Sequence, residues 1–257
     1  MNTVLKIGGH PLQDEAFLTE LAQTVHALQQ PIIIVHGGGD EVSALQRDLG
    51  IEPRYHEGLR ITDPASLRLM TMAIGGLINK RLVAHLLSAG VDALGISGLD
   101  RAIVRAKTHP ALAGSHTGVI TQVNGARIRQ MLALGITPVI APLCIGEDGL
   151  RQYNVNADHV AAAIAAALHS ERLFFLTDVP GVLDEAGQLL RELDAETTAT
   201  LLDEGIIHHG MVPKVRSALD ALAQGASGAT IGDLPAFRAH SGTTFITQSK
   251  QMEIPSP

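Results

Sequence analysis

The sequence contains few of the residues that stabilise small secreted proteins or stack against nucleic-acid bases. It has one cysteine and no tryptophan in 257 residues, and aromatic residues make up only 3%. A single cysteine, Cys144, excludes an internal disulfide, and its place in an apolar run predicts a buried thiol in a reducing compartment. With 19 basic and 26 acidic residues the net charge is −7, which argues against a nucleic-acid-binding surface.

Long hydrophobic runs and a basic leader followed by an apolar stretch are also lacking. The alanine-rich segment at 161–168 is too short to span a bilayer, and the first residues are those of a short strand. We therefore expect a soluble, cytoplasmic protein without a membrane partner. At this length the chain can form one large α/β domain or two closely joined lobes.

What is present is an alternation of short, β-branched runs with longer helical patterns. The first strands are expected at 4–7 and 31–35, each followed by a helical pattern, at about 14–29 and 40–49. Further strands are expected at 93–96, 137–140, 172–176, 229–231 and 244–247, and further helices at 64–89, 126–134, 157–169, 195–204 and 213–224. This order predicts an α/β fold with a mostly parallel sheet, and a change of glycine motifs near residue 170 favours two lobes sharing that sheet.

Two glycine-rich segments follow the first two strands. Lys6-Ile-Gly-Gly9 combines a lysine with backbone N–H groups that an anion can approach, although a surface lysine before a turn has the same pattern. Val35-His-Gly-Gly-Gly-Asp40 places three glycines between a strand and a helix, where α/β sheets bind phosphates or oxyanions. A P-loop is absent, and Gly95-Ile-Ser-Gly-Leu99 does not match the G-x-S-x-G of a hydrolase.

A third motif, Tyr153-Asn-Val-Asn-Ala-Asp158, opens the helix expected at 157. Helix capping explains Asn156 and Asp158 but leaves Asn154 without a role. Two amides at alternating positions also suit a ligand that carries amide and carboxylate groups.

The fourth motif joins two segments, Leu176-Thr-Asp-Val-Pro-Gly-Val182 and Gly210-Met-Val-Pro-Lys-Val215. The second opens a helix, so Lys214 lies where the helix dipole disfavours a cation; it is either solvated or paired with an anionic ligand. Arg60 is a candidate clamp for a carboxylate, although lone arginines are also common on surfaces. The 12 histidines do not show zinc-ligand spacing, so no protein-built metal site is predicted.

Taken in order, these motifs resemble those of the amino acid kinase family, from residue 3 to about 247. The match also includes Gly58-Leu-Arg-Ile-Thr62, Asn79-Lys80 and Gly95-Ile-Ser-Gly98. The resemblance implies a three-layer αβα sandwich around a mostly parallel sheet. It also implies a lobe at 1–170 for acylamino acid binding and dimerisation and a lobe at 171–257 for ATP binding.

The resemblance implies a role for each matching residue. Lys6 and Lys214 would hold the transferring phosphoryl group from opposite sides, and Asp158 would orient both lysines. The substrate side would be formed by Gly37, Gly38, Arg60, Asn154 and Asn156. The phosphate and nucleotide side would be formed by Gly8, Gly9, Thr177, Asp178, Gly181, Gly210 and Met211. Mg²⁺ would enter with ATP and keep several waters instead of occupying a protein cage.

Within the family, the motifs are most similar to those of members that phosphorylate the γ-carboxylate of N-acetyl-L-glutamate in arginine biosynthesis. A carboxylate is ionised at pH 7 and needs no general base, so positioning and charge neutralisation suffice to form an acyl phosphate. Arginine-inhibited members carry an additional N-terminal helix that joins dimers into hexamers. Because the first strand begins by Thr3, we expect an arginine-insensitive homodimer.

Two alternatives remain open on the sequence alone. One is a kinase for aminoadipate or glutamate linked to a small acidic carrier protein, which would need a basic patch around its substrate pocket. The other is a catalytically silent amino-acid sensor. Gly98-Leu-Asp-Arg101 and Gly232-Asp-Leu-Pro235 also depart from the family pattern; these changes concern the adenine-side edge and the dimer surroundings and leave every proposed phosphoryl-transfer residue in place.

Overall fold

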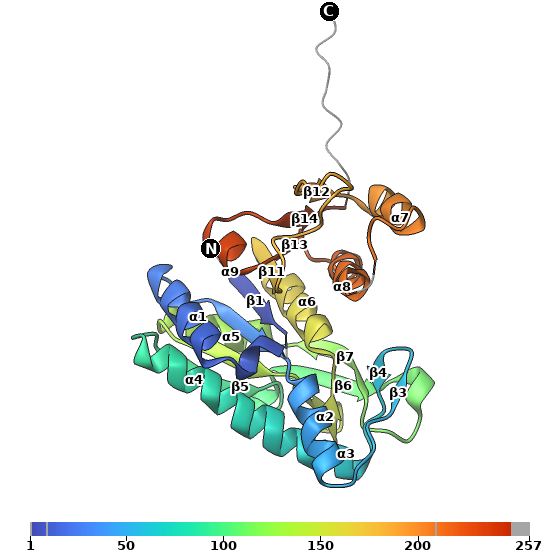
Figure 1. Ribbon diagram of the computed structural model, residues 1–257. Helices are drawn as coiled ribbons and strands as arrows, with labels where there is room; N and C mark the ends of the chain where they lie inside the picture. The colour runs from blue at the N-terminus through green and yellow to red at the C-terminus, as the bar shows by residue number, and fades with distance from the viewer. Residues whose placement is uncertain (1, 9, 209, 248–257) are drawn as a thin grey trace, which may run out of the picture.

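The computed structural model describes residues 2–8, 10–208 and 210–247, in which helices cover both faces of a central sheet (Figure 1). The sheet has eight strands in the order β12-β14-β13-β11-β1-β2-β8-β5, and only β13 and β14 pair antiparallel. The strands are β1 Thr3–Ile7, β2 Ile33–His36, β5 Ala93–Ser97, β8 Thr137–Ala141, β11 Arg172–Leu176, β12 Glu192–Leu193, β13 Ala229–Gly232 and β14 Thr243–Phe245. The predicted α/β fold with a mostly parallel sheet is confirmed.

The helices form two layers because strand residues alternate between the two faces of the sheet. On β1, Val4 packs into the core beneath one helical layer, whereas Leu5 and Ile7 pack into the core beneath the other. The first layer contains α5 Gly125–Ala133, α6 Ala157–Leu168 and α8 Met211–Ala223. The second contains α1 Glu15–Ala27, α4 Asn79–Ser88 and α9 Leu234–Arg238. This arrangement is the three-layer αβα sandwich that the family resemblance implies.

The sequence pattern at 64–89 predicts one helix, but the structure divides it into three parts. α3 Pro64–Met70 and α4 are joined by a π-helical segment, Thr71–Ile78. A Cβ added to Gly38 would lie 2.4 Å from Cδ1 of Ile78, so the π-helical segment packs directly against the triple-glycine loop. π-Helical turns are rare and occur frequently at functional sites, and this one adjoins the loop expected to bind an anion.

A second, four-stranded sheet was not predicted. Its order is β10-β9-β6-β7, with β6 Val104–Thr108, β7 Gly118–Val123, β9 Leu143–Gly146 and β10 Gln152–Asn154. A separate hairpin pairs β3 Tyr55–His56 with β4 Leu59–Arg60. Most of these strands are short and mix polar with apolar residues, and β9 continues the apolar run of β8, so none of them gives a separate strand signal in the sequence. They nevertheless carry Arg60 and Asn154 to one side of the central sheet.

The two halves of the chain meet in the middle of the main sheet. Strands before residue 170 occupy one half and strands after it the other, with β1 and β11 paired at the junction. The remaining helices are α2 Gly39–Asp48 and α7 Ala195–Asp203, with 3₁₀ turns at His10–Gln13, Asp100–Ala102 and Pro110–Leu112. None of the helices in the described ranges is long and apolar enough to cross a membrane.

Candidate active site

Two pockets adjoin at the carboxyl ends of β1, β2 and β11, and both are lined by Lys6 and Asp40. Parallel pairing places Lys6 opposite Val35 of β2 and Phe175 of β11, so the loops after these strands emerge at one edge of the sheet. Ligands of open α/β sheets bind at this edge. One pocket, of about 340 Å³, extends toward β11 and α8; the other, of about 420 Å³, extends toward the β3–β4 hairpin.

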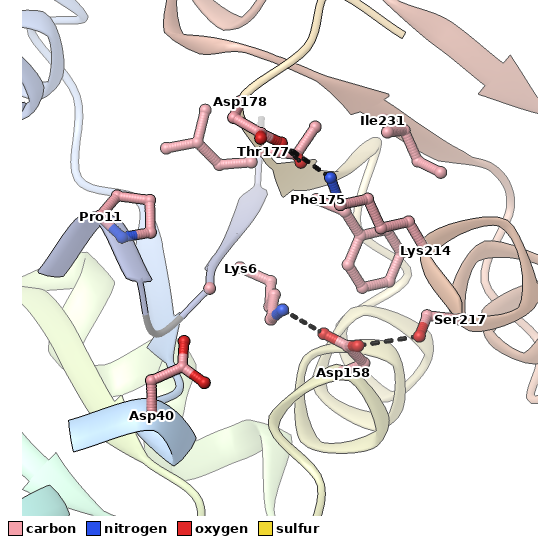
Figure 2. A pocket seen from close by; sticks show the side chains of 12 residues that line it. Lys6, Pro11, Asp40, Asp158, Phe175, Thr177, Asp178, Lys214, Ser217 and Ile231 are labelled. Atoms are coloured by element: carbon pink, nitrogen blue, oxygen red, sulfur yellow. Dashed lines mark hydrogen bonds and ion pairs between the residues drawn. The ribbon is translucent and has the colours of Figure 1, made fainter. Parts of the chain in front are cut away.

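Lys6 forms an ion pair with Asp158 at the first of these pockets (Figure 2). Lys6 lies on the same face of β1 as Val4, which is the face covered by α6, and Asp158 is in the first turn of α6. The Nζ–Oδ1 distance is 2.7 Å, and Oγ of Ser217 donates to Oδ2 of Asp158 at 2.8 Å. Burial works to raise the pKa of Asp158, but the Lys6 charge and the two hydrogen bonds outweigh it and leave that pKa below its usual value.

Lys214 has a different partner. Its Nζ lies 2.8 Å from Oδ1 of Asp178, which also accepts a hydrogen bond from the Thr177 hydroxyl. The hydrogen bonds from Lys214 and Thr177 lower the pKa of Asp178 to about 2. That Asp158 orients both lysines stays a prediction; Asp158 contacts Lys6, whereas the more exposed Asp178 holds Lys214. This pairing also offsets the unfavourable place of Lys214 in the first turn of α8.

The first pocket includes part of the predicted nucleotide site. Gly8, Thr177 and Asp178 line it together with the two lysines. Apolar lining comes from Pro11, Phe175, Leu176 and Ile231. These side chains form a surface on which a flat apolar group can pack beside the lysines.

Four residues predicted for the nucleotide side have other positions. Gly181, Gly210 and Met211 line neither pocket, and Gly9 lies outside the described residues. Gly181 has a φ of +150°, and an added Cβ would lie 2.6 Å from Oγ1 of Thr243, so close packing explains this glycine. Gly210 precedes α8, and Met211 packs against the core beneath it. Nucleotide contacts at these positions stay predictions.

Arg60 is the buried cation of the second pocket, with 9% of its surface exposed. Its guanidinium donates to the Gln46 side chain, to the Gly39 carbonyl at 2.9 Å and to Oγ of Ser43 at 2.7 Å, and it lies over the Tyr55 ring at 4.8 Å. Burial lowers the pKa of Arg60, whereas Tyr55 and Asp40 act to raise it. Among the described residues, no carboxylate lies within ion-pair distance of it.

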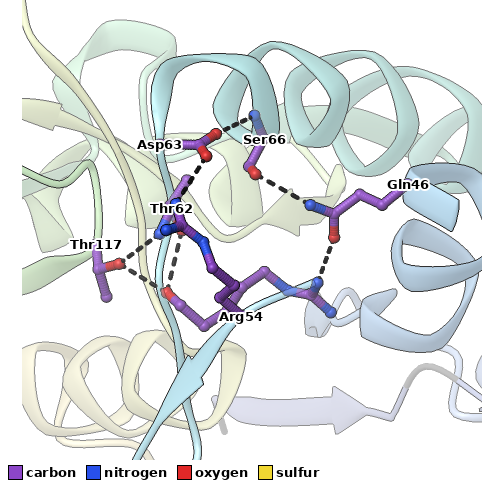
Figure 3. A network of polar contacts seen from close by, with 7 residues as sticks. Gln46, Arg54, Thr62, Asp63, Ser66 and Thr117 are labelled. Carbon is purple, nitrogen blue, oxygen red and sulfur yellow. Dashed lines mark hydrogen bonds and ion pairs between the residues drawn. The ribbon is translucent and has the colours of Figure 1, made fainter. Parts of the chain in front are cut away.

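Neighbouring polar residues keep Arg60 and its strand in place (Figure 3). Gln46 donates to Ser66 at 3.0 Å, which orients the amide oxygen toward Arg60. The Thr117 hydroxyl donates to the Arg60 carbonyl at 2.7 Å and accepts from the Thr62 amide at 3.1 Å. The guanidinium is therefore positioned before any ligand binds.

Both predicted asparagines line this second pocket. Asn156 caps α6, since its Oδ1 accepts from the Asp158 amide at 2.8 Å, and this leaves its NH₂ group for a ligand. Asn154 is buried on β10 and donates to the Thr62 hydroxyl at 3.2 Å. Capping thus accounts for only part of this motif, and both amides reach the pocket.

The triple-glycine loop forms part of the wall of the second pocket, which Lys6 also lines. Gly37 and Gly38 both line it. The Gly37 amide donates to the Ile7 carbonyl at 2.9 Å, whereas the Gly38 amide has no acceptor among the described residues. Gly38 has a φ of +154° and lies against Ile78, so a side chain is excluded both by backbone conformation and by space. An unpaired amide beside a lysine suits an oxyanion.

Several lining residues were not predicted. Asp40 directly follows the triple glycine, and Ser217 lies three residues after Lys214 on the same face of α8, so spacing could have identified both. The second pocket also contains Tyr55, His109, Thr117 and His159. Tyr55, His109 and Thr117 lie far from the recognised motifs or on the unpredicted strands, so the sequence contains no local signal for them.

The sequence matches the Amino acid kinase family profile over residues 1–233. It is 44% identical over 253 residues to an acetylglutamate kinase of Chloroflexus aggregans, covering 96% of this chain and 98% of that protein. The structure superposes on smu.665 from Streptococcus mutans (29% identity, TM-score 0.79, covering 96% of this chain and 99% of that one). It also superposes on an N-acetylglutamate synthase from Neisseria gonorrhoeae complexed with coenzyme A and N-acetyl-glutamate (25%, 0.80, 96% and 60%). The chain belongs to the amino acid kinase family.

Proposed function

We propose that this protein transfers the γ-phosphoryl group of ATP to the γ-carboxylate of N-acetyl-L-glutamate. The observation that carries the proposal is the pair of pockets that adjoin at Lys6 and Asp40. One pocket has the apolar lining and the lysines suited to a nucleotide triphosphate. The other has a buried arginine with no carboxylate partner among the described residues, and a ligand carboxylate would provide one.

The residues suit a reaction that depends on positioning and charge. The substrate carboxylate is ionised at neutral pH, so it attacks the phosphoryl group without a base. Lys6 and Lys214 neutralise charge that develops on the phosphoryl oxygens, and the Gly38 amide donates to one of them. Asp158 keeps Lys6 in place, and Lys214 leaves Asp178 to reach the nucleotide. The product is an acyl phosphate.

Mg²⁺ accompanies ATP in this proposal. In the described ranges, no three histidine, cysteine or carboxylate side chains converge as a metal site. A magnesium ion that keeps most of its water ligands needs only one or two carboxylates in addition to the nucleotide phosphates. Asp40, which lines both pockets, and Asp178 are the carboxylates placed to contact such an ion or its waters.

Charge around the second pocket favours a free substrate over a carrier-linked one. Among the described residues that line it, Lys6 and Arg60 are the only lysine or arginine side chains, and Asp40 lies between the pockets. A surface that binds an acidic carrier protein needs a cluster of exposed cations. The 40–44% identity to several acetylglutamate kinases supports the same choice, with arginine biosynthesis as the implied pathway.

A homodimer is part of the proposal. β5 is an edge strand of the main sheet, and exposed apolar side chains lie on β5 itself, on the adjoining α4 and on the π-helical segment that precedes α4. They are Met72, Leu77, Leu87 and Leu94, each more than 40% exposed. Apolar patches next to an open edge are typical of subunit interfaces. Light scattering should give twice the monomer mass of 27.1 kDa, unchanged by arginine.

The test is a hydroxylamine trap with MgATP and N-acetyl-L-glutamate. The expected result is hydroxamate that depends on both substrates and on Mg²⁺. A carrier-linked enzyme would be almost inactive with free acetylglutamate but active with an aminoadipyl or glutamyl carrier. An amino-acid sensor would bind acetylglutamate without forming hydroxamate from any acylamino acid, and that outcome would overturn the proposal.

A further inference from the structure

A buried polar cluster lies directly beneath the triple-glycine loop, and the proposed reaction does not use it. It consists of His36 at the end of β2 and Asn79 at the start of α4, both with 0% of their surface exposed, and Lys80 beside them. Nδ1 of His36 lies 2.9 Å from the Gly37 carbonyl oxygen, and Nε2 lies 3.0 Å from Nδ2 of Asn79. Buried polar groups require such partners, so each bond constrains the next.

The partners determine which nitrogen of His36 carries the proton. Nδ2 of Asn79 lies 2.9 Å from the Val139 carbonyl, which can only accept, and Oδ1 of Asn79 accepts from Nζ of Lys80 at 3.1 Å. The Asn79 amide nitrogen therefore faces Nε2 of His36 as a donor, and Nε2 must be bare. The proton lies on Nδ1, which donates to the Gly37 carbonyl.

That hydrogen bond determines the orientation of the following peptide group. The Gly37 carbonyl and the Gly38 amide belong to one planar trans peptide, so they point in opposite directions. His36 holds the carbonyl toward the buried cluster, and the amide must then point away from it. Gly38 lines the substrate-side pocket, and its amide has no acceptor among the described residues.

The space for this cluster is also built into the fold. A Cβ added to Gly95 would lie 2.2 Å from Oδ1 of Asn79, and Nζ of Lys80 donates to the Gly95 carbonyl at 2.8 Å. Any side chain at position 95 would therefore occupy the space that the Asn79 side chain needs. Asn79-Lys80 and Gly95 belong to the ordered motifs, yet none of them lines either pocket.

We propose that His36, oriented by Asn79, is a positioning residue that directs the Gly38 amide toward the transferring phosphoryl group. The inference rests on the proposed function for the identity of the ligand but not for the geometry. Burial lowers the pKa of His36 to about 4, with Lys80 acting in the same direction and the bond to Gly37 opposing it. The ring is therefore neutral during turnover, as a single fixed tautomer requires.

The first test needs no substrate. In the ¹⁵N-labelled full-length protein, the ring nitrogen shifts of His36 report its tautomer, with His36→Asn identifying its signals among those of the 12 histidines. The expected result at pH 7 is a proton on Nδ1 and a bare Nε2. A proton on Nε2 would overturn the inference whatever reaction the protein catalyses.

The second test uses two substitutions at one position. His36→Leu removes the donor, and we expect kcat to fall by about 10- to 100-fold while KM for MgATP stays within about twofold. His36→Asn keeps an N–H near the place of Nδ1 and should recover most of that loss. Equal activity of the folded Leu variant and the wild type, or equal losses in both variants, would contradict a positioning role.

The third test changes the tautomer through Asn79. In Asn79→Asp the carboxylate accepts a hydrogen bond from Nε2–H, which holds the proton of the neutral ring on Nε2, so Nδ1 is protonated only in the imidazolium form. Activity should then fall as pH rises, a titration that the wild type lacks; Lys80 is the charged group that faces this network. An unchanged pH profile in the folded variant would overturn the inference. If the wild type forms no hydroxamate, the proposed function is rejected. The tautomer of His36, which is measured without substrate, still tests this inference on its own.

Discussion

The two pockets are prepared for their ligands to different degrees. On the substrate side, Arg60 is buried and held by Gln46, Ser43 and the Gly39 carbonyl before any ligand is present. On the nucleotide side, the one salt-bridge partner of Lys214 among the described residues is Asp178, whose side chain is 79% exposed. The substrate side can therefore bind its ligand with little rearrangement, whereas Lys214 must exchange partners when the nucleotide binds.

Lys6 is held by a largely buried carboxylate and Lys214 by an exposed one, so replacing the two lysines tests this difference most directly. We expect either Lys6→Ala or Lys214→Ala to lower kcat by about 1,000-fold, since each removes a cation that stabilises the transition state. Only Lys6→Ala should also lower stability, because it leaves the buried Asp158 carboxylate unpaired. Hydroxamate rates and thermal unfolding measure the two effects.

Lys107→Ala is the matched control for these variants, since Lys107 is exposed on β6 and lines neither pocket. It should retain wild-type activity. Substantial activity in Lys214→Ala would show that Lys214 does not leave Asp178 to bind the nucleotide. The difference between the two pockets would then have no role in catalysis.

The next largest effect is expected at Arg60. A lysine at this position cannot satisfy the Gln46, Ser43 and Gly39 acceptors together or grip a carboxylate with two N–H groups. We expect Arg60→Lys to raise KM for N-acetyl-L-glutamate by about 10- to 100-fold, corresponding to the loss of one charge-assisted pair, while KM for MgATP stays unchanged. Steady-state kinetics with each substrate varied in turn measures this difference.

Arg54→Lys provides the control, because Arg54 pairs with Asp63 on the surface near the same hairpin. Its KM values should not change. A rise in KM for MgATP in Arg60→Lys, equal to that for the acylamino acid, would place Arg60 at the junction of both sites and weaken the separation drawn here.

The buried cluster beneath the substrate pocket should make stability depend on pH. The pKa of His36 is lowered from 6.5 to about 4 in the folded protein, so only the unfolded chain takes up a proton between these values. Stability is fully present above pH 6.5 and should fall by roughly 3 kcal/mol as the pH drops to 4. Urea unfolding of the wild type and of His36→Asn over this range isolates the effect, and parallel curves for the two proteins would contradict it.

The smallest effect is expected from the exposed ion pair. Asp178→Ala should change the free energy of unfolding by less than about 1 kcal/mol, because exposed ion pairs contribute little. Asp158→Ala should cost clearly more, since Lys6 would lose its partner in a largely buried place. Equal losses in the two variants would show that the two lysines are held equally firmly.

The main sheet and its helices could be predicted because their signals are local. Strands such as β11 contain continuous apolar runs, here 173–176, and glycine motifs mark the edge at which ligands bind. The pairing of Lys214 with Asp178 was not predicted, because it depends on which of two carboxylates, Asp158 or Asp178, the helix that carries Lys214 approaches. No local pattern reports such a distance.

The sequence by itself determined the alternating α/β order, the glycine loops and the identities of the two lysines, because each rests on periodicity or on a short motif. Only the tertiary structure decided that two pockets adjoin at Lys6 and Asp40, that Asp178 holds Lys214, and that the neutral His36 orients the Gly37–Gly38 peptide. These features join residues distant in the sequence, and packing around the sheet decides which of them meet.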